Sequence, residues 1–199
     1  MGQETEVIDR YLTVSLPLSL TFTDFPDRDN LAVIIFFSGC KNNCPGCQNP
    51  ELQDFNFGTK MTEIELYNEV DKYASCKGIR KIVLSGGDPY FQDETEMSLF
   101  LHLLYTTDYE ICLYTGVSDL ESIKEKFWPY VTYYKCGKYD EHEHIKERYW
   151  GKLPDKMVFV SKNQKLYNRD LKQISVDNVY YFDHWDTLKA KVKKFLKRD

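Results

Sequence analysis

The sequence predicts an α/β protein with a mostly parallel β-sheet. A strand, a loop, a capped helix and another strand recur at about 30 residues, which is the size of a βαβ unit. The strand expected at 32–37 is apolar throughout, as strands covered on both faces are. No linker-like composition divides the 199 residues, so we expect a single domain over 1–199.

Composition narrows the classes of function. The net charge of −5 gives no electrostatic case for binding nucleic acid. No stretch approaches the roughly 20 apolar residues of a membrane span, and the acidic N-terminus has no export signal. We therefore expect a cytoplasmic protein with reduced cysteines. Three cysteines, Cys76, Cys112 and Cys136, are scattered, so a disulfide framework is not expected.

The first half of the chain begins with two strands. Residues 12–22 alternate apolar with polar and suggest an edge strand broken at Pro17. The apolar strand at 32–37 follows. Thr62 and Glu65 form a capping box that starts a helix closed by 77–78. Its expected apolar stripe is Ile64, Leu66, Val70 and Tyr73.

The second half continues the alternation. Strands are expected at 81–84, 110–114 and 130–134, and further ones at 157–160 and 178–182. Helices are expected to start at three caps: Asp93 with Glu96, Ser118 with Glu121, and Asp186. The second helix should bury Met97, Phe100, Leu103 and Leu104. The last, basic helix is expected to pack on the sheet through an amphipathic face, and the charged stretch 141–148 should be a loop or short helix.

Three cysteines follow the 32–37 strand directly. Cys40, Cys44 and Cys47 have the spacing C-x3-C-x2-C. A structural zinc site is closed by four ligands, and ordinary iron–sulfur clusters take four cysteines. If these three bind a four-iron cluster, one iron stays open to a small molecule. Two other readings remain: a zinc site that borrows a distant fourth ligand, and plain reduced thiols.

A glycine-rich loop follows the strand at 81–84. In parallel α/β folds, sites form at the carboxyl ends of strands, so this loop, the cysteine loop and the turn at 115–116 should converge. Gly86 and Gly87 would let a ligand lie against the backbone. Asp88 adds an acceptor for a cationic group. An ordinary strand-to-helix turn is the alternative.

These motifs resemble the radical S-adenosylmethionine superfamily, and most closely the family of activating proteins for anaerobic ribonucleoside-triphosphate reductase. The matching stretches are 37–51, 84–89 and 113–116, with weaker likeness at 134–139 and 161–167. The resemblance covers roughly 20–168. The first 20 residues and a strand and helix over 170–199 have no counterpart.

The resemblance implies a role for each motif residue. Cys40, Cys44 and Cys47 would hold a [4Fe–4S] cluster, whose open iron would be chelated by S-adenosylmethionine. The residues that would contact this cofactor are Gly46, Cys47, Gln48, Gly86, Gly87 and Asp88. Asp88 and Gly86 would lie near its amino group. Gln48 stands where relatives often have an aromatic residue or His, which removes any stacking contribution.

The resemblance also implies a reaction and partners. One electron from the reduced cluster would cleave S-adenosylmethionine, and the resulting radical would take a hydrogen from a glycine of the reductase. A flavodoxin-like or other low-potential donor would supply the electron. The expected fold is a partial, open (βα) barrel, because about 200 residues is the lower limit for eight units. The alternatives are a radical enzyme acting on another peptide or small molecule, and a zinc-stapled binding module.

Two further candidates carry less weight. His142 and His144 lie two apart in a charged loop, but a closed metal site needs three or four ligands. Cys136, near the end of an expected strand, is best interpreted as a small buried residue.

Overall fold

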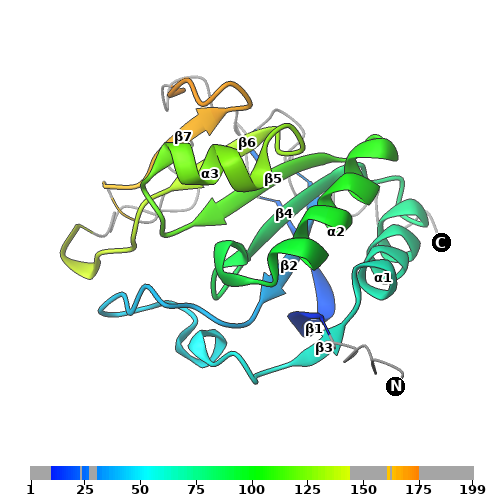
Figure 1. The fold of residues 1–199 in the computed structure, drawn as a ribbon, viewed down its shortest axis with the longest axis horizontal. Helices are drawn as coiled ribbons and strands as arrows, with labels where there is room; N and C mark the ends of the chain where they lie inside the picture. Colours follow the sequence, from blue (N-terminus) through cyan, green and yellow to red (C-terminus); the bar gives the residue numbers. More distant parts are fainter. Residues whose placement is uncertain (1–9, 23, 27–30, 144–160, 162, 175–199) are drawn as a thin grey trace, which may run out of the picture.

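The computed structural model describes residues 10–22, 24–26, 31–143, 161 and 163–174 (Figure 1). These residues form one sheet of seven strands in the order β3-β1-β2-β4-β5-β6-β7. The strands are β1 (Leu12–Thr21), β2 (Ala32–Phe37), β3 (Thr59–Met61), β4 (Lys81–Gly86), β5 (Glu110–Thr115), β6 (Tyr133–Cys136) and β7 (Lys165–Asn168). The α-helices are α1 (Glu63–Ser75), α2 (Glu94–Thr106) and α3 (Leu120–Phe127). Three short 3-10 helices are η1 (Pro50–Gln53), η2 (Pro89–Phe91) and η3 (Glu141–Glu143).

The centre of the sheet is parallel and its flanks are antiparallel. Strands β2, β4, β5 and β6 run parallel, whereas β1 pairs antiparallel with both β2 and β3, and β7 pairs antiparallel with β6. This confirms the predicted α/β class with a mostly parallel sheet. The described sheet is open, and its assignment to a partial barrel stays a prediction.

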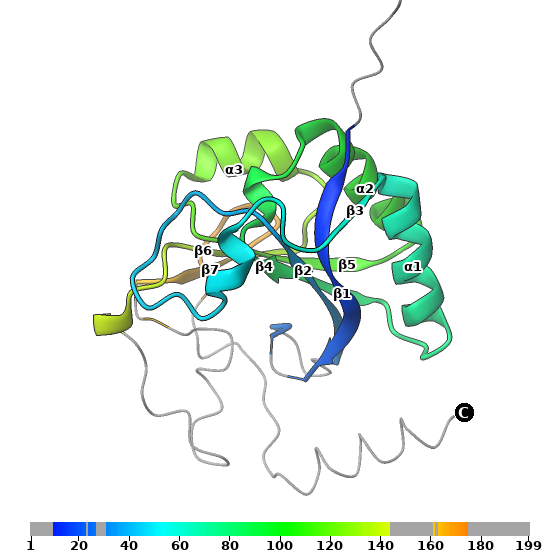
Figure 2. The same cartoon turned by 90° about the horizontal axis from the view of Figure 1, so that it is seen from below.

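The three helices lie on one face of the sheet (Figure 2). The main core lies between these layers and is built from fully buried residues, among them Val70 of α1, Leu104 of α2 and Ile123 of α3. The capping box predicted for Thr62 and Glu65 is present at the start of α1. Each helix thus begins at a side-chain cap and turns an apolar stripe toward the sheet.

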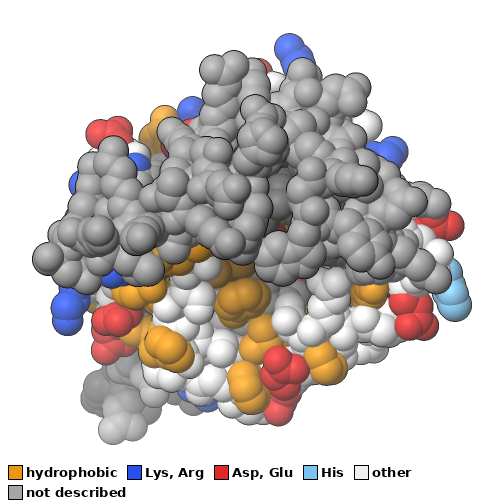
Figure 3. All heavy atoms as spheres, turned by 180° about the vertical axis from the view of Figure 1, so that it is seen from behind, with side chains coloured by type: hydrophobic (Ala, Val, Ile, Leu, Met, Phe, Trp, Pro, Cys, Tyr) orange, Lys and Arg blue, Asp and Glu red, His pale blue; other side chains and the backbone are white. Residues whose placement is uncertain are grey.

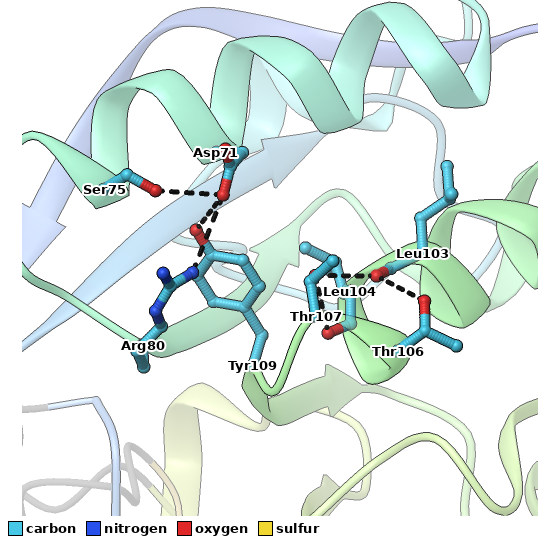
Figure 4. Close-up of polar contacts among 8 residues, drawn as sticks. All are labelled: Asp71, Ser75, Arg80, Leu103, Leu104, Thr106, Thr107 and Tyr109. Atoms are coloured by element: carbon cyan, nitrogen blue, oxygen red, sulfur yellow. Dashed lines mark hydrogen bonds and ion pairs between the residues drawn. The ribbon is translucent and has the colours of Figure 1, made fainter.

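A polar cluster at the surface joins α1 to the amino ends of β4 and β5 (Figure 4). The Tyr109 hydroxyl donates a hydrogen bond of 2.8 Å to Asp71 Oδ1, and Ser75 Oγ donates another of 3.0 Å. Arg80 Nη1 lies 3.6 Å from the same carboxylate oxygen. These contacts fix the end of the sheet opposite the cysteine loop.

Several expected boundaries were wrong. Strand β1 is unbroken at Pro17, although its pairing register with β2 shifts between Ser15 and Ser19. It is not the edge strand, because β3 pairs with residues 12–14. Helix α3 is capped by Asp119, not by Ser118, because the Asp119 carboxylate accepts from the Glu121 N–H.

Burial also differs in detail from the expected stripes. Of the expected stripe of α1, Leu66 and Val70 are buried, Tyr73 is partly buried and Ile64 is 48% exposed; Ala74 completes the buried side. In α2, Leu101 is buried where Leu103 was expected. Strand β6 starts at Tyr133 rather than Tyr130. The expected elements at 157–160, at 178–182 and after Asp186 lie outside the described residues.

The face of the sheet opposite the helices carries a second, smaller apolar cluster. Phe25, Ala32, Ile34, Val83 and Cys112 are buried there. Figure 3 shows the molecule from this side, with hydrophobic side chains interspersed among polar ones over the described part that is visible. Strands β2, β4 and β5 bury side chains on both faces of the sheet, and β2 is apolar throughout, as predicted. Among the described helices, none is long and apolar enough to cross a membrane.

Candidate cluster-binding site

A cleft of about 290 Å³ opens at the carboxyl ends of the parallel strands. Residues that follow β2, β4, β5 and β6 all contribute to its walls. The predicted convergence of the cysteine loop, the glycine-rich loop and the 115–116 turn is thereby confirmed. Predicted site residues that line the cleft are Cys40, Cys44, Cys47, Gln48, Gly86 and Gly87.

The cysteine loop is shaped by its own backbone. The three thiols are free and half-buried. Asn42 N–H points at Cys40 Sγ, 3.4 Å away, and Cys47 N–H donates to the Cys44 carbonyl at 3.2 Å. Gly46 has φ +65°, a left-handed conformation that glycine adopts at no steric cost. The loop therefore places all three cysteines on the wall of the cleft.

Burial influences the protonation of the thiols. It raises the pKa of Cys40 and of Cys44, and hydrogen bonds from backbone N–H groups oppose the rise in both cases. A nearby cation reverses this preference, because thiols that coordinate a metal are deprotonated. The thiols are therefore expected to be neutral in the free loop and deprotonated when they bind an iron–sulfur cluster.

Gly86 and Gly87 serve a close approach between protein backbones. Gly87 N–H donates to the Phe37 carbonyl at 2.7 Å, and Asp88 N–H donates to the Gly39 carbonyl at 3.0 Å. A Cβ on Gly87 would lie 2.8 Å from the Gly39 oxygen, which is inside contact distance. The glycine pair therefore holds the β4 loop against the cysteine loop, a reason that the sequence interpretation did not include.

Asp88 is buried and surrounded by donors from the protein itself. It is 1% exposed. Its Oδ1 accepts from Tyr90 N–H at 3.0 Å. Its Oδ2 accepts from Asn42 Nδ2 at 2.7 Å, Gly116 N–H at 2.8 Å and Thr115 Oγ1 at 3.0 Å. Burial raises the pKa of Asp88, and these hydrogen bonds oppose the rise. A direct contact with a cofactor amino group stays a prediction.

Sequence reasoning missed several residues of the site. Lys135 is 5% exposed on β6, lines the cleft, and has its Nζ 4.2 Å from the centre of the Tyr114 ring. The sequence feature that could have identified Lys135 is a lysine within an otherwise apolar and aromatic strand. The Gln92 side chain accepts from Thr13 N–H at 3.0 Å and donates to the Ser38 carbonyl at 2.8 Å, which ties β1 to the end of β2. Nothing in the local pattern singles it out.

Neither His142 nor Cys136 is among the residues that line the cleft. His142 is exposed on η3, and His144 lies outside the described residues. Cys136 is buried, as expected, and burial raises its pKa to about 12. All six cysteines are free. Within the described ranges, no three His, Cys, Asp or Glu side chains are grouped so that they could hold a single metal ion.

The donor set fits an iron–sulfur cluster. Such clusters are ligated by cysteine thiolates, and here the three loop cysteines line a single cleft. A cluster takes each thiolate on a different iron, so its ligands need not surround one point as the ligands of zinc do. The cleft also contains space beside the thiols, bounded by Gly86, Gly87 and Gln48, for a further ligand.

Comparison with known proteins agrees with this chemistry. Residues 30–159, well over half of the chain, match the family described as 4Fe-4S single cluster domain. The chain is also similar to the anaerobic ribonucleoside-triphosphate reductase-activating protein of Enterobacteria phage T4, with 28% identity over 149 residues. That match covers 73% of this chain and 88% of the phage protein. The chain therefore belongs to the family described as 4Fe-4S single cluster domain.

Proposed function

We propose that this protein cleaves S-adenosylmethionine reductively at a [4Fe–4S] cluster and generates a glycyl radical on an anaerobic ribonucleoside-triphosphate reductase. One observation carries the proposal: three half-buried thiols and a Gly-Gly loop line the same cleft at the carboxyl ends of parallel strands. The likeness to the phage activating protein supports the choice of partner.

The site residues have two roles in this proposal, binding the cluster and contacting the cofactor. Cys40, Cys44 and Cys47 hold the cluster and leave one iron without a protein ligand. Gly46 and Gln48 flank the last cysteine and contact the cofactor. Gly86, Gly87 and Asp88 contribute backbone and carboxylate groups near its methionine end. Of these, Gly46 and Asp88 are not among the residues that line the cleft: Gly46 shapes the turn of the cysteine loop, and the Asp88 carboxylate is held by donors of the protein itself.

The chain's own residues place the reactants and limit water. When bound and reduced, the cluster supplies the electron that splits the sulfonium into methionine and a 5′-deoxyadenosyl radical. Two apolar residues, Ile34 and Phe36, line the cleft beside its polar residues and would help to exclude water. The partner's glycine would reach the cleft from its open side, and a low-potential donor such as a flavodoxin would supply the electron.

The test compares cysteine variants after anaerobic reconstitution with iron and sulfide. A Cys40→Ala/Cys44→Ala/Cys47→Ala triple variant should bind no cluster and form no 5′-deoxyadenosine when dithionite and S-adenosylmethionine are added. The matched control is Cys76→Ala, because Cys76 is exposed and lies outside the cleft. It should retain the iron content and the cleavage rate of the wild type.

Three results would contradict the proposal in different ways. Iron retained unchanged in the triple variant would place the cluster elsewhere. About one zinc with no iron or sulfide per chain would favour the zinc-stapled binding module. Cleavage of S-adenosylmethionine without any radical on the reductase would favour a radical enzyme acting on another peptide or small molecule.

A further inference from the structure

Asp88 is a junction between three segments that are distant in sequence. Its carboxylate accepts from Asn42 of the cysteine loop, from Tyr90 of η2, and from Thr115 and Gly116 at the end of β5. The carboxylate is nearly inaccessible to solvent, with 1% of the residue exposed. A buried carboxylate is strongly favoured to keep such donors, because losing one costs more than it would in water.

Asn42 is the only one of these donors that belongs to the cysteine loop. Its side chain reaches Asp88 Oδ2 at 2.7 Å, and its backbone N–H points at Cys40 Sγ at 3.4 Å. It stands at the centre of the C-x3-C spacing, and it also lines the cleft. Through this residue, a cluster-ligand sulfur is connected to a buried carboxylate of the glycine-rich loop.

The neighbouring backbone is built to admit the Asn42 side chain. A Cβ placed on Gly116 would lie 2.8 Å from Asn42 Cγ, well inside contact distance. Gly116 also donates its own N–H to the same Asp88 oxygen. The turn after β5 therefore leaves room for the Asn42 amide and shares its acceptor.

We propose that Asn42 is a positioning residue, which fixes the cysteine loop to the sheet through its hydrogen bond with Asp88. Asn42 itself touches no reacting atom in this account. It sets how tightly the loop holds Cys40 and how closely the Asn42 N–H approaches the Cys40 sulfur. The effect on the cluster rests on the proposed function. The hydrogen bond between Asn42 and Asp88 and its effect on Cys40 labelling do not depend on it.

The first test uses the full chain without iron. Iodoacetamide labels the thiols under native conditions, and mass spectrometry follows Cys40 and Cys44, with exposed Cys76 as the internal reference. Asn42→Ala removes the hydrogen bond. Asn42→Asp keeps the shape of the side chain but places a second carboxylate against Asp88. Both should label Cys40 about tenfold faster than the wild type, as loss of a hydrogen bond to a charged group loosens a local segment.

The matched control is Asn56→Ala. Asn56 lies in an exposed loop, and its side chain bonds only to Asp54, at 3.5 Å. Its labelling rates should equal those of the wild type. Circular dichroism checks that each variant is folded, and Asn42→Asp separates the hydrogen bond from mere filling of space.

The second test uses reconstituted protein. Hydrogen bonds to cluster sulfurs tune the reduction potential, so both Asn42 variants should show a more negative midpoint potential and Asn56→Ala should not. Labelling and potential that are unchanged in both Asn42 variants would overturn the inference. So would faster labelling in Asn42→Ala alone, because Asn42 would then only fill space. If the wild type assembles no cluster, the proposed function is wrong. The inference about the hydrogen bond is then decided by the labelling test alone.

Discussion

The helix-covered face of the sheet and the cysteine rim are held together by different forces. Between helices and sheet, side chains such as Leu66, Phe100 and Leu104 are fully buried in one apolar cluster. At the rim, backbone groups meet at hydrogen-bond distance, and two buried polar side chains, Asp88 and Gln92, join the segments. Apolar burial is tolerant of local shape, whereas these polar contacts are directional. Stability and site geometry should therefore respond to different substitutions.

The largest effect on stability is expected in the helix layer. Leu104→Ala removes a fully buried side chain of α2 and should lower the free energy of unfolding by about 2–5 kcal/mol. Leu99→Ala on the same helix is the control, because Leu99 is 44% exposed and its loss should cost no more than about 0.5 kcal/mol. Urea unfolding measures both. Iron bound per folded molecule should stay at the wild-type value in each, and a loss of iron in Leu104→Ala would show that the two regions are coupled.

Gly87→Ala tests the rim directly. The new Cβ would meet backbone atoms of Gly39 and Leu52, so the cysteine loop must move, at a cost of about 1–3 kcal/mol for overpacking. Here the iron content after reconstitution should fall together with stability. Gly78→Ala is the control: nothing lies within 4 Å of its Cβ, and its φ of +67° limits the cost to about 1–2 kcal/mol. Full iron content in Gly87→Ala would refute the close approach as a requirement of the site.

The sequence predicted the helix layer better than the rim, for physical reasons. Periodicity and caps are local, so the starts of α1 and α2 at Thr62 and Asp93 could be read directly. Strands β3 and β7 were missed because they have three and four residues and largely polar sequences. Pairing with a neighbour, not a local pattern, makes them strands.

At the site, the sequence indicated the motifs but not how they connect. The cysteines and Gly86-Gly87 were found from spacing and composition, and the topology explained why they share a rim. Asp88 was interpreted as an acceptor for a ligand, yet its donors come from residues 46 positions before and 27 and 28 positions after it. Contacts of that range have no signature in a single sequence.

Gln92→Ala should have an intermediate effect. It leaves the Thr13 N–H and the Ser38 carbonyl without their partner, and an unsatisfied buried group costs about 1–3 kcal/mol. Chemical unfolding should show this loss, with Gln173→Ala, an exposed glutamine, as the unaffected control. Because Ser38 precedes the cysteine motif, cluster loss on exposure to air should also be faster. A variant as stable as the wild type would mean that water replaces the side chain.

The smallest effect is expected at the surface cluster of Figure 4. Tyr109→Phe removes the hydrogen bond to Asp71 and should cost about 0.5–1.5 kcal/mol. The end of the sheet opposite the rim carries this contact, so iron content and thiol labelling should not change. Tyr105→Phe, at a 39% exposed tyrosine, is the control for the same atom change. Thermal unfolding compares the pair, and an altered iron content in Tyr109→Phe would argue against separate control of the two regions.

The most direct test of the proposed activity is electron paramagnetic resonance on an anaerobic mixture of the reconstituted protein, an anaerobic ribonucleoside-triphosphate reductase, dithionite and S-adenosylmethionine. We expect a stable glycyl radical on the reductase that requires every component and is absent with the Cys40/Cys44/Cys47 triple alanine variant. The Cys76→Ala control should give the wild-type signal. A reduced cluster that cleaves S-adenosylmethionine but leaves the reductase without a radical would contradict the assignment.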